Sequence, residues 1–175
     1  EALSGIGEMI VALGKTLPEA EYNKCGENIW VAKDAIVAPS ACINGPAIIG
    51  RGAEARHCAY IRGNALVGAK AVVGNSTELK NVILFDGVQV PHYNYVGDSI
   101  LGYKSHMGAG SITSNVKADK SFVFIHAQDA EIETGLKKMG AILGDNVEIG
   151  GGAVLNPGTI ICRQRTVYPL SSVRG

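Results

Sequence analysis

The sequence predicts an all-β fold, a solenoid of triangular cross-section in which short parallel strands stack coil upon coil. Two observations support this prediction: aliphatic residues recur every six residues along most of the chain, and many of the 23 glycines directly follow one of them. A period of six fits neither a 3.6-residue helix nor an alternating strand. It suits a coil of three flat walls, about 18 residues long, whose strands lie about 4.8 Å from those of the next coil.

Two runs of aliphatic residues define the frame. The first run holds nine positions spaced by six residues, namely Val31, Val37, Ile43, Ile49, Ala55, Ile61, Val67, Val73 and Leu79. The second run holds Leu143, Ile149, Leu155, Ile161, Val167 and Val173. Between the runs the frame slips by one residue, continues through Leu84, Val90 and Val96, and slips again to Leu101 and Met107. We expect these side chains to point into a narrow interior. An antiparallel sandwich is the alternative, but it would not hold one frame for nine hexads.

Two segments lie outside this frame. Residues 2–14 carry apolar side chains at helical spacing, and Gly14 is placed to end the helix. We therefore predict an N-terminal helical arm over residues 1–28 and a solenoid domain over residues 29–175. Residues 116–139 break the six-residue period, so we expect a loop extruded from one corner, containing a hairpin or a short helix. A long insertion in a regular solenoid is typical of a functional element or an oligomer contact.

Composition excludes several classes of partner. Sixteen basic residues balance sixteen acidic ones and the pI is about 7.1, so we predict neither a nucleic-acid partner nor a membrane-bound protein. The apolar runs are too short to span a bilayer. Four cysteines lie far apart without a CxxC pair, so we expect no metal site and no disulfide framework. Reduced thiols of this kind favour a cytoplasmic location.

The period also places charged residues in columns. Arg62 directly follows the interior residue Ile61, and Lys80 follows Leu79 three hexads later. Both should therefore lie on one outer wall, about one strand spacing apart. Two stacked cations repel unless an anion or a carboxylate lies between them. One interpretation is a phosphate clamp with a standing repulsion in the ligand-free protein. The other is a solvated basic edge that a nearby carboxylate, Glu78 or Asp98, neutralises.

A histidine stands out in the segment richest in aromatic and polar residues, residues 89–98. His92 lies two residues after interior residue Val90, so it should stack between Asn75 and Ala109. The ordinary pKa of histidine is about 6.5, so an outward His92 beside Tyr95 can serve as a general base. Residues 107–111 are glycine-rich and form either a phosphate loop or a tight corner whose backbone N–H groups face a ligand.

These segments resemble a known family. The six-residue pattern over residues 29–175 resembles the hexapeptide-repeat proteins, which implies a left-handed parallel β-helix. Residues 92–98 and 108–115, with 74–80 and 59–63 at constant spacing before them, resemble the acetyltransferase domain of the bifunctional N-acetylglucosamine-1-phosphate uridyltransferase/glucosamine-1-phosphate acetyltransferase. The chain is also similar to stand-alone bacterial proteins labelled as UDP-N-acetylglucosamine pyrophosphorylases. The uridyltransferase domain has no counterpart in these residues, so we do not predict nucleotidyl transfer.

The resemblance implies an activity and a set of roles. The activity is acetyl-CoA-dependent N-acetylation of an amino sugar 1-phosphate in the UDP-N-acetylglucosamine pathway, without a metal, by a homotrimer with its sites between solenoids. His92 is the implied catalytic base. The implied substrate-binding residues are Arg62, Lys80, Tyr95 and Asn115, together with Glu78. The implied acetyl-CoA-binding residues are Gly108 and Ala109, with Lys120 nearby, and backbone N–H groups of this corner would stabilise an oxyanion.

The sequence departs from the family pattern at three positions on the acetyl-CoA side. His106 replaces an asparagine, Val116 replaces a tyrosine, and Ser121 stands where a lysine is expected, with Lys120 one residue early. Two other classes of function remain open. One is a non-catalytic trimerising or ligand-sensing module related to sugar nucleotidyltransferases. The other is a zinc-dependent lyase of the γ-carbonic anhydrase type, which needs a closely spaced histidine pair that His92, His106 and His126 do not form.

Overall fold

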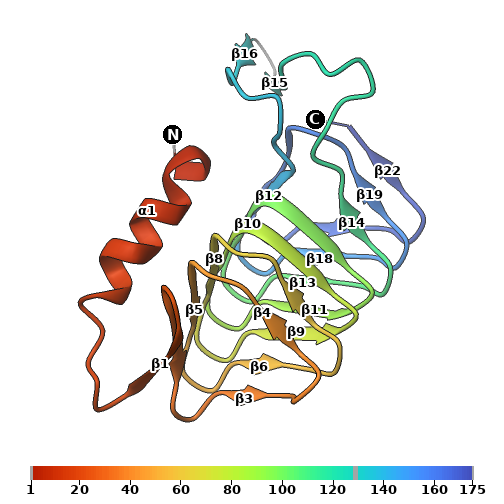
Figure 1. Cartoon of the computed structure of the whole chain (residues 1–175). Helices are drawn as coiled ribbons and strands as arrows, with labels where there is room; N and C mark the ends of the chain where they lie inside the picture. Colours follow the sequence, from red (N-terminus) through yellow and green to blue (C-terminus); the bar gives the residue numbers. More distant parts are fainter. Residues whose placement is uncertain (1, 128–129, 175) are drawn as a thin grey trace.

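The chain forms a left-handed parallel β-helix with one α-helix along its side and a hairpin projecting from it (Figure 1). The structure is a computed structural model that describes residues 2–127 and 130–174. Strands of successive coils pair in parallel along each wall. The predicted all-β solenoid is therefore confirmed, and the antiparallel sandwich is excluded.

Three faces make up the solenoid. Face 1 contains β2 (Ile29–Ala32), β5 (Ala47–Ile49), β8 (Ala65–Val67), the second halves of β10 (Glu78–Leu84) and β12 (Tyr95–Leu101), β17 (Ala141–Leu143) and β20 (Thr159–Ile161). Face 2 contains β3 (Ile36–Val37), β6 (Glu54–Ala55), β9 (Val72–Asn75), β11 (Gln89–His92), β13 (His106–Met107), β18 (Glu148–Ile149) and β21 (Thr166–Val167). Face 3 contains β4 (Cys42–Ile43), β7 (Tyr60–Ile61), the first halves of β10 and β12, β14 (Ile112–Thr113), β19 (Val154–Leu155) and β22 (Ser172–Val173).

The core is the column of aliphatic side chains inside the coils. In the middle coils the predicted interior residues are buried, as for Ile61, Leu79 and Leu101. At the two ends of the solenoid as described by residues 2–127 and 130–174, the interior is only partly covered by neighbouring coils. Val37, a predicted interior residue near one end, is accordingly 36% exposed.

The two frame slips mark shortened corners between faces 3 and 1. Leu84 pairs with Val67 and Leu101 pairs with Leu84, one residue fewer per coil than the spacing between Ile49 and Val67. At these corners β10 and β12 run through from one face to the next. A single residue with left-handed backbone makes each bend, Asn81 (φ 55°) and Asp98 (φ 49°). The corner side chains are therefore polar ones that tolerate this conformation.

Helix α1 (Ala2–Gly14) forms where the spacing of apolar residues predicts a helix, and it packs along face 1 (Figure 1). Its side chains Leu3, Ile6 and Ile10 are buried against outward aliphatic residues of that face. Gly14 lies so close to the Trp30 ring that a Cβ there would overlap it, which explains the small residue at the helix end. No helix in residues 2–127 and 130–174 is long and apolar enough to cross a membrane.

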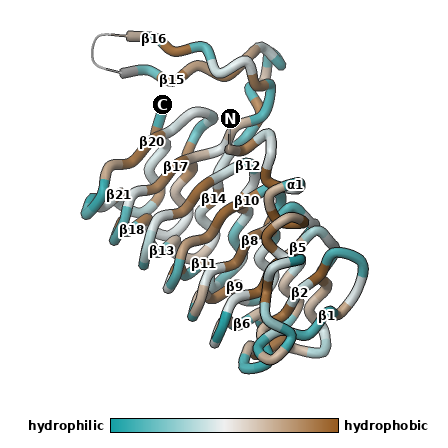
Figure 2. Tube along the Cα trace, turned by 90° about the vertical axis from the view of Figure 1, so that its left-hand side faces the viewer, coloured by the Kyte–Doolittle hydropathy of each residue, from teal (hydrophilic) through white to brown (hydrophobic). Residues whose placement is uncertain are grey.

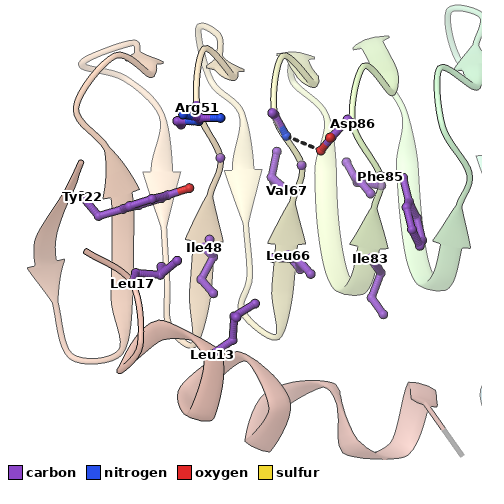
Figure 3. A pocket seen from close by; sticks show the side chains of 14 residues that line it. Leu13, Leu17, Tyr22, Ile48, Arg51, Leu66, Val67, Ile83, Phe85 and Asp86 are labelled. Atoms are coloured by element: carbon purple, nitrogen blue, oxygen red, sulfur yellow. Dashed lines mark hydrogen bonds between the residues drawn. The ribbon is translucent and has the colours of Figure 1, made fainter. Parts of the chain in front are cut away.

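The segment after α1 closes the first coil. Strand β1 (Tyr22–Gly26) pairs antiparallel with β2, so the N-terminal arm contains a strand as well as the helix. Between the end of α1 and face 1 lies an apolar pocket lined by Leu13, Leu17 and Tyr22 (Figure 3). Burial raises the pKa of the Tyr22 phenol above its ordinary value.

The insertion forms a hairpin. Strands β15 (Phe124–Ala127) and β16 (Ala130–Glu133) pair antiparallel, with Ile125 opposite Ile132. Figure 2 shows this hairpin lying apart from the stacked coils. Of the two forms that the sequence left open, the described residues 116–127 and 130–139 contain the hairpin and no helix. The base of the insertion is held by Val123 and Met139, which are buried in the cluster beneath α1.

Candidate active site

The candidate residues lie on face 3 and at the two corners that border it. His92 ends β11 at the corner between faces 2 and 3, and β12 begins three residues later with Tyr95. His92 pairs with Asn75 below it. The Gly110 N–H donates to the His92 carbonyl at 3.0 Å, which aligns Ala109 with His92 in the coil above. The predicted column of Asn75, His92 and Ala109 is therefore confirmed.

Arg62 and Lys80, the two cations predicted to stack, share a column, and each of them is paired with a carboxylate. Because Leu79 pairs with Ile61, Arg62 and Lys80 occupy aligned positions on the outer wall. Arg62 Nη1 lies 2.7 Å from Glu78 Oε1, and Lys80 Nζ lies 3.0 Å from Asp98 Oδ1. The expectation of a standing repulsion between them is therefore wrong. The neutralising carboxylates are the two that the sequence suggested.

Asp98 is the centre of a polar network that joins residues distant in the sequence. Its side chain is only 6% exposed, and its carboxylate accepts hydrogen bonds from Lys80, from Asn81 at 2.9 Å and from Asn115. The Asn115 amide also donates to the Tyr95 hydroxyl at 3.2 Å. The buried carboxylate thus holds Lys80 and Asn115 directly, and Tyr95 through Asn115. The sequence suggested Asp98 only as a counter-ion; the frame slip at this position was the available signal for more.

The Tyr95 phenol is held in its neutral form. Burial raises its pKa above the ordinary value, the charge of Asp98 raises it further, and the hydrogen bond from Asn115 partly offsets these effects. At neutral pH the hydroxyl therefore keeps its proton. It can donate this proton in a hydrogen bond to a ligand oxygen while accepting from Asn115.

Asn94 positions the His92 corner and was not recognised in the sequence. Its side chain is buried, and its amide donates to the carbonyls of Gly108 (2.9 Å) and Ser111 (3.0 Å). Its Oδ1 accepts the His92 backbone N–H at 3.1 Å. These bonds tie His92 to the glycine-rich segment of the next coil. A signal existed: small residues elsewhere in this interior column give way to polar ones in three successive coils, at Thr77, Asn94 and Ser111.

The groups that would face a ligand are few. The His92 ring is exposed, and in residues 2–127 and 130–174 it has no hydrogen bond or ion pair. The Gly108 N–H donates to the Ile149 carbonyl at 2.7 Å, so it cannot serve as the expected oxyanion donor. The Ala109 N–H has no acceptor in the described part of the chain. Gly110, with φ of 70°, shows that residues 107–111 form a tight corner.

Other predicted residues stay outside this arrangement within one chain. Lys120 is exposed in a turn closed by its own N–H and the Lys117 carbonyl, and its side chain contacts none of the candidate residues among those described. Ser121 bonds to Asp119 at 2.8 Å, and Val116 is 40% exposed. His106 Nδ1 lies 2.9 Å from Glu148 Oε2.

The histidines do not assemble a metal site. In the ranges that the structure describes, no three His, Cys, Asp or Glu side chains lie close enough together to hold a metal ion. His92 and His106 belong to face 2 and its corner, whereas His126 lies on the projecting hairpin, where its Nδ1 is 3.4 Å from Glu131. The three-histidine arrangement of the lyase alternative therefore has no counterpart among these residues.

Comparisons with known proteins identify the family to which the chain belongs. Residues 26–169 match the family described as the GMPPB C-terminal domain. The chain is 39% identical over 103 residues to the bifunctional protein GlmU of Methanococcus maripaludis, covering 59% of this chain and 25% of that protein. It is 31% identical over 110 residues to the bifunctional sugar-1-phosphate nucleotidylyltransferase/acetyltransferase of Sulfurisphaera tokodaii, covering 63% and 27%. The chain thus spans about a quarter of the length of these curated relatives.

A solved structure shows the same fold. A hexapeptide transferase family protein from Anaplasma phagocytophilum superposes with a TM-score of 0.61 at 18% identity, covering 82% of this chain and 73% of that one.

Proposed function

The chain belongs to the family of GMPPB C-terminal domains, and on this basis we propose that it is an acyltransferase. Its substrate is an amino sugar 1-phosphate, which it N-acetylates with acetyl-CoA. One observation carries the proposal: His92, which is exposed and has no hydrogen bond or ion pair among the described residues, adjoins a wall on which Lys80 and Asn115 bond to Asp98. The Tyr95 phenol joins this network through Asn115. The name of the Sulfurisphaera tokodaii relative, which includes acetyl transfer, agrees with it.

The wall suits a phosphate group. The Arg62 side chain is 44% exposed and uses Nη1 for Glu78, so further guanidinium N–H groups remain for a phosphate oxygen. Lys80 adds a point charge from the same column, and its side chain is 28% exposed. A planar fork and an ammonium together match a phosphomonoester that carries nearly two negative charges. The Tyr95 hydroxyl and the Asn115 amide would orient the sugar.

His92 would perform the proton transfer. Acetyl-CoA, when bound, supplies the acetyl group as a thioester. His92 accepts the proton that the substrate amine loses as its nitrogen bonds to the acyl carbon, and a protonated His92 can return that proton to the leaving thiolate. The Ala109 N–H can donate to the oxygen that becomes negative in the tetrahedral intermediate. Asn94 holds both corner segments in place through its bonds to His92 and Gly108.

An assay of CoA thiol release from acetyl-CoA and glucosamine-1-phosphate tests the proposal. Arg62→Ala should raise the KM for the sugar phosphate by about 10-fold or more, because a charge-assisted bond to phosphate is lost. Arg56→Ala is the matched control: Arg56 pairs with Glu54 at 2.8 Å and its side chain is 45% exposed, almost as for Arg62. The control should leave the KM unchanged.

Two outcomes would contradict this assignment. Equal KM changes in the Arg62 and Arg56 variants would mean that the phosphate binds elsewhere. Calorimetric binding of glucosamine-1-phosphate, with no release of CoA from acetyl-CoA for any amino sugar 1-phosphate tested, would instead indicate the non-catalytic, ligand-sensing module.

We also propose that the working form is a homotrimer with sites at its seams. A single chain leaves Lys120 apart from the other candidates and exposes large side chains near His92, including Tyr93 at 65%. A neighbouring solenoid would cover these residues and complete the site. Size-exclusion chromatography with light scattering should give about three times the 18.3 kDa chain mass. A stable monomer with full activity would rule out a shared site.

A further inference from the structure

A second cluster of reactive side chains lies outside the proposed acetyltransferase site. His57 and Cys58 form the corner between faces 2 and 3 two coils before His92, and Ser40 forms the same corner one coil earlier. Ser40 Oγ lies 2.6 Å from His57 Nδ1, and Cys58 Sγ lies 3.2 Å from His57 Nε2. All three side chains are exposed. The cluster therefore brings a thiol, an imidazole and a hydroxyl into direct contact at the surface.

The chemistry of the groups assigns the direction of these bonds. A thiol donates more readily to an imidazole nitrogen than its sulfur accepts from one, so Nε2 is the acceptor of the Cys58 S–H. The ring proton then resides on Nδ1, which donates to Ser40 Oγ. Ser40 Oγ also accepts the Cys58 backbone N–H at 3.2 Å. A nucleophile, a base and a group that orients the base thus form a continuous chain.

The fold holds this arrangement in place. The carbonyl of His57 accepts the Asn75 side-chain amide at 3.1 Å and the Ser76 backbone N–H at 3.3 Å, both from the next coil. Cys58 has a left-handed backbone with φ of 56°, as Ser76 and Tyr93 do at the same corner of the following coils. The corner conformation is therefore a regular feature of the solenoid. The thiol and the imidazole are therefore both carried by a corner whose backbone is fixed by the coils stacked on it.

We propose that Cys58 is a nucleophilic thiol activated by His57 and a site of modification by disulfides. As Cys58 Sγ bonds to one sulfur of the disulfide, its proton passes to His57 Nε2. The original S–S bond breaks, and the departing thiolate takes the proton back from the imidazolium. One disulfide and one thiol are consumed and one of each is formed, so no external oxidant is needed.

The other cysteines provide internal controls. Cys25, Cys42 and Cys162 are exposed free thiols like Cys58. Among the described residues none of these three contacts a histidine; Cys25 Sγ lies 3.8 Å from the Asn23 carbonyl. Differences in rate between the four thiols therefore report the effect of His57 more than the effect of access.

The experiment treats the native protein with 5,5′-dithiobis(2-nitrobenzoate) at neutral pH and assigns each modified cysteine by peptide mass spectrometry. Cys58 should react at least about 10-fold faster than Cys42 and Cys162, because general-base assistance accelerates its attack. His57→Gln should reduce the Cys58 rate to that of Cys42, and Ser40→Ala should reduce it partly. His126→Gln, which alters a distant exposed histidine, should have no effect.

Equal rates for the four cysteines in the wild-type protein would overturn the proposal, as would an unreactive Cys58. So would an unchanged Cys58 rate in His57→Gln. The wild-type comparison needs no variant, so the test stands even where a substitution disturbs the fold. Circular dichroism of each variant identifies such a case.

Discussion

Replacement of His92 by alanine is expected to lower the turnover of acetyl transfer by about 10²–10⁴-fold, the usual contribution of a general base. The fold and the oligomeric state should not change, because the His92 ring has no hydrogen bond or ion pair within the described residues. The effect should fall on kcat more than on KM, since the ring acts on the proton of the amine. Steady-state kinetics with both substrates measures it.

His126→Ala is the matched control for this variant. His126 is also exposed, at 56% of its side chain, but it lies on the projecting hairpin and pairs with Glu131. It should retain wild-type turnover. If His92→Ala retained it as well, another group would accept the proton. His106, whose Nδ1 is held by Glu148, would then be the next residue to replace.

Asp98→Ala should cause the largest loss of stability among the site variants, about 2–4 kcal/mol of the free energy of unfolding. Removing one partner of a largely buried ion pair leaves the other partners uncompensated. Here Lys80 would lose its carboxylate partner, and Asn81 and Asn115 would each lose one hydrogen-bond acceptor. The exposed part of Lys80 can still reach water, which keeps the loss below the upper range for such pairs. Urea denaturation monitored by circular dichroism measures the change.

Asp86→Ala is the control for Asp98→Ala. Asp86 is an exposed corner carboxylate that accepts one backbone N–H, from Ala69 at 2.7 Å, as the dashed line in Figure 3 shows. Its loss should cost only about 1 kcal/mol. An equal loss of unfolding free energy in both variants would mean that the Asp98 network stabilises the fold no more than a single exposed hydrogen bond does. Arg62 and Lys80 are each paired with a carboxylate, so replacing both with alanine should lower the free energy of unfolding. Two unpaired cations would instead make the double variant more stable than the wild type.

Much of the site could be predicted because a parallel solenoid converts sequence spacing into position. The coil length, once the two frame slips are included, brings His92 into line with Asn75 and Arg62 into line with Lys80, so the columns follow from counting residues. The side-chain contacts within the columns could not be predicted by counting residues. The pairing of Lys80 with Asp98 depends on a corner that one left-handed residue makes, and the hydrophobic period does not describe side-chain direction at a corner.

The sequence by itself determined the fold class, the helix over residues 2–14 and the location of the insertion, because hydrophobic period and its interruptions are local properties of the chain. The tertiary structure alone decided which polar groups are already satisfied. The Gly108 N–H donates to the Ile149 carbonyl, in a coil that follows the insertion, whereas the Ala109 N–H has no acceptor in the part of the chain that the structure describes. Ser40 likewise contacts His57 and Cys58 only because two coils stack. Hydrogen bonds form between groups that folding brings within about 3 Å, and spacing along the sequence fixes such distances only for the backbone of a regular coil.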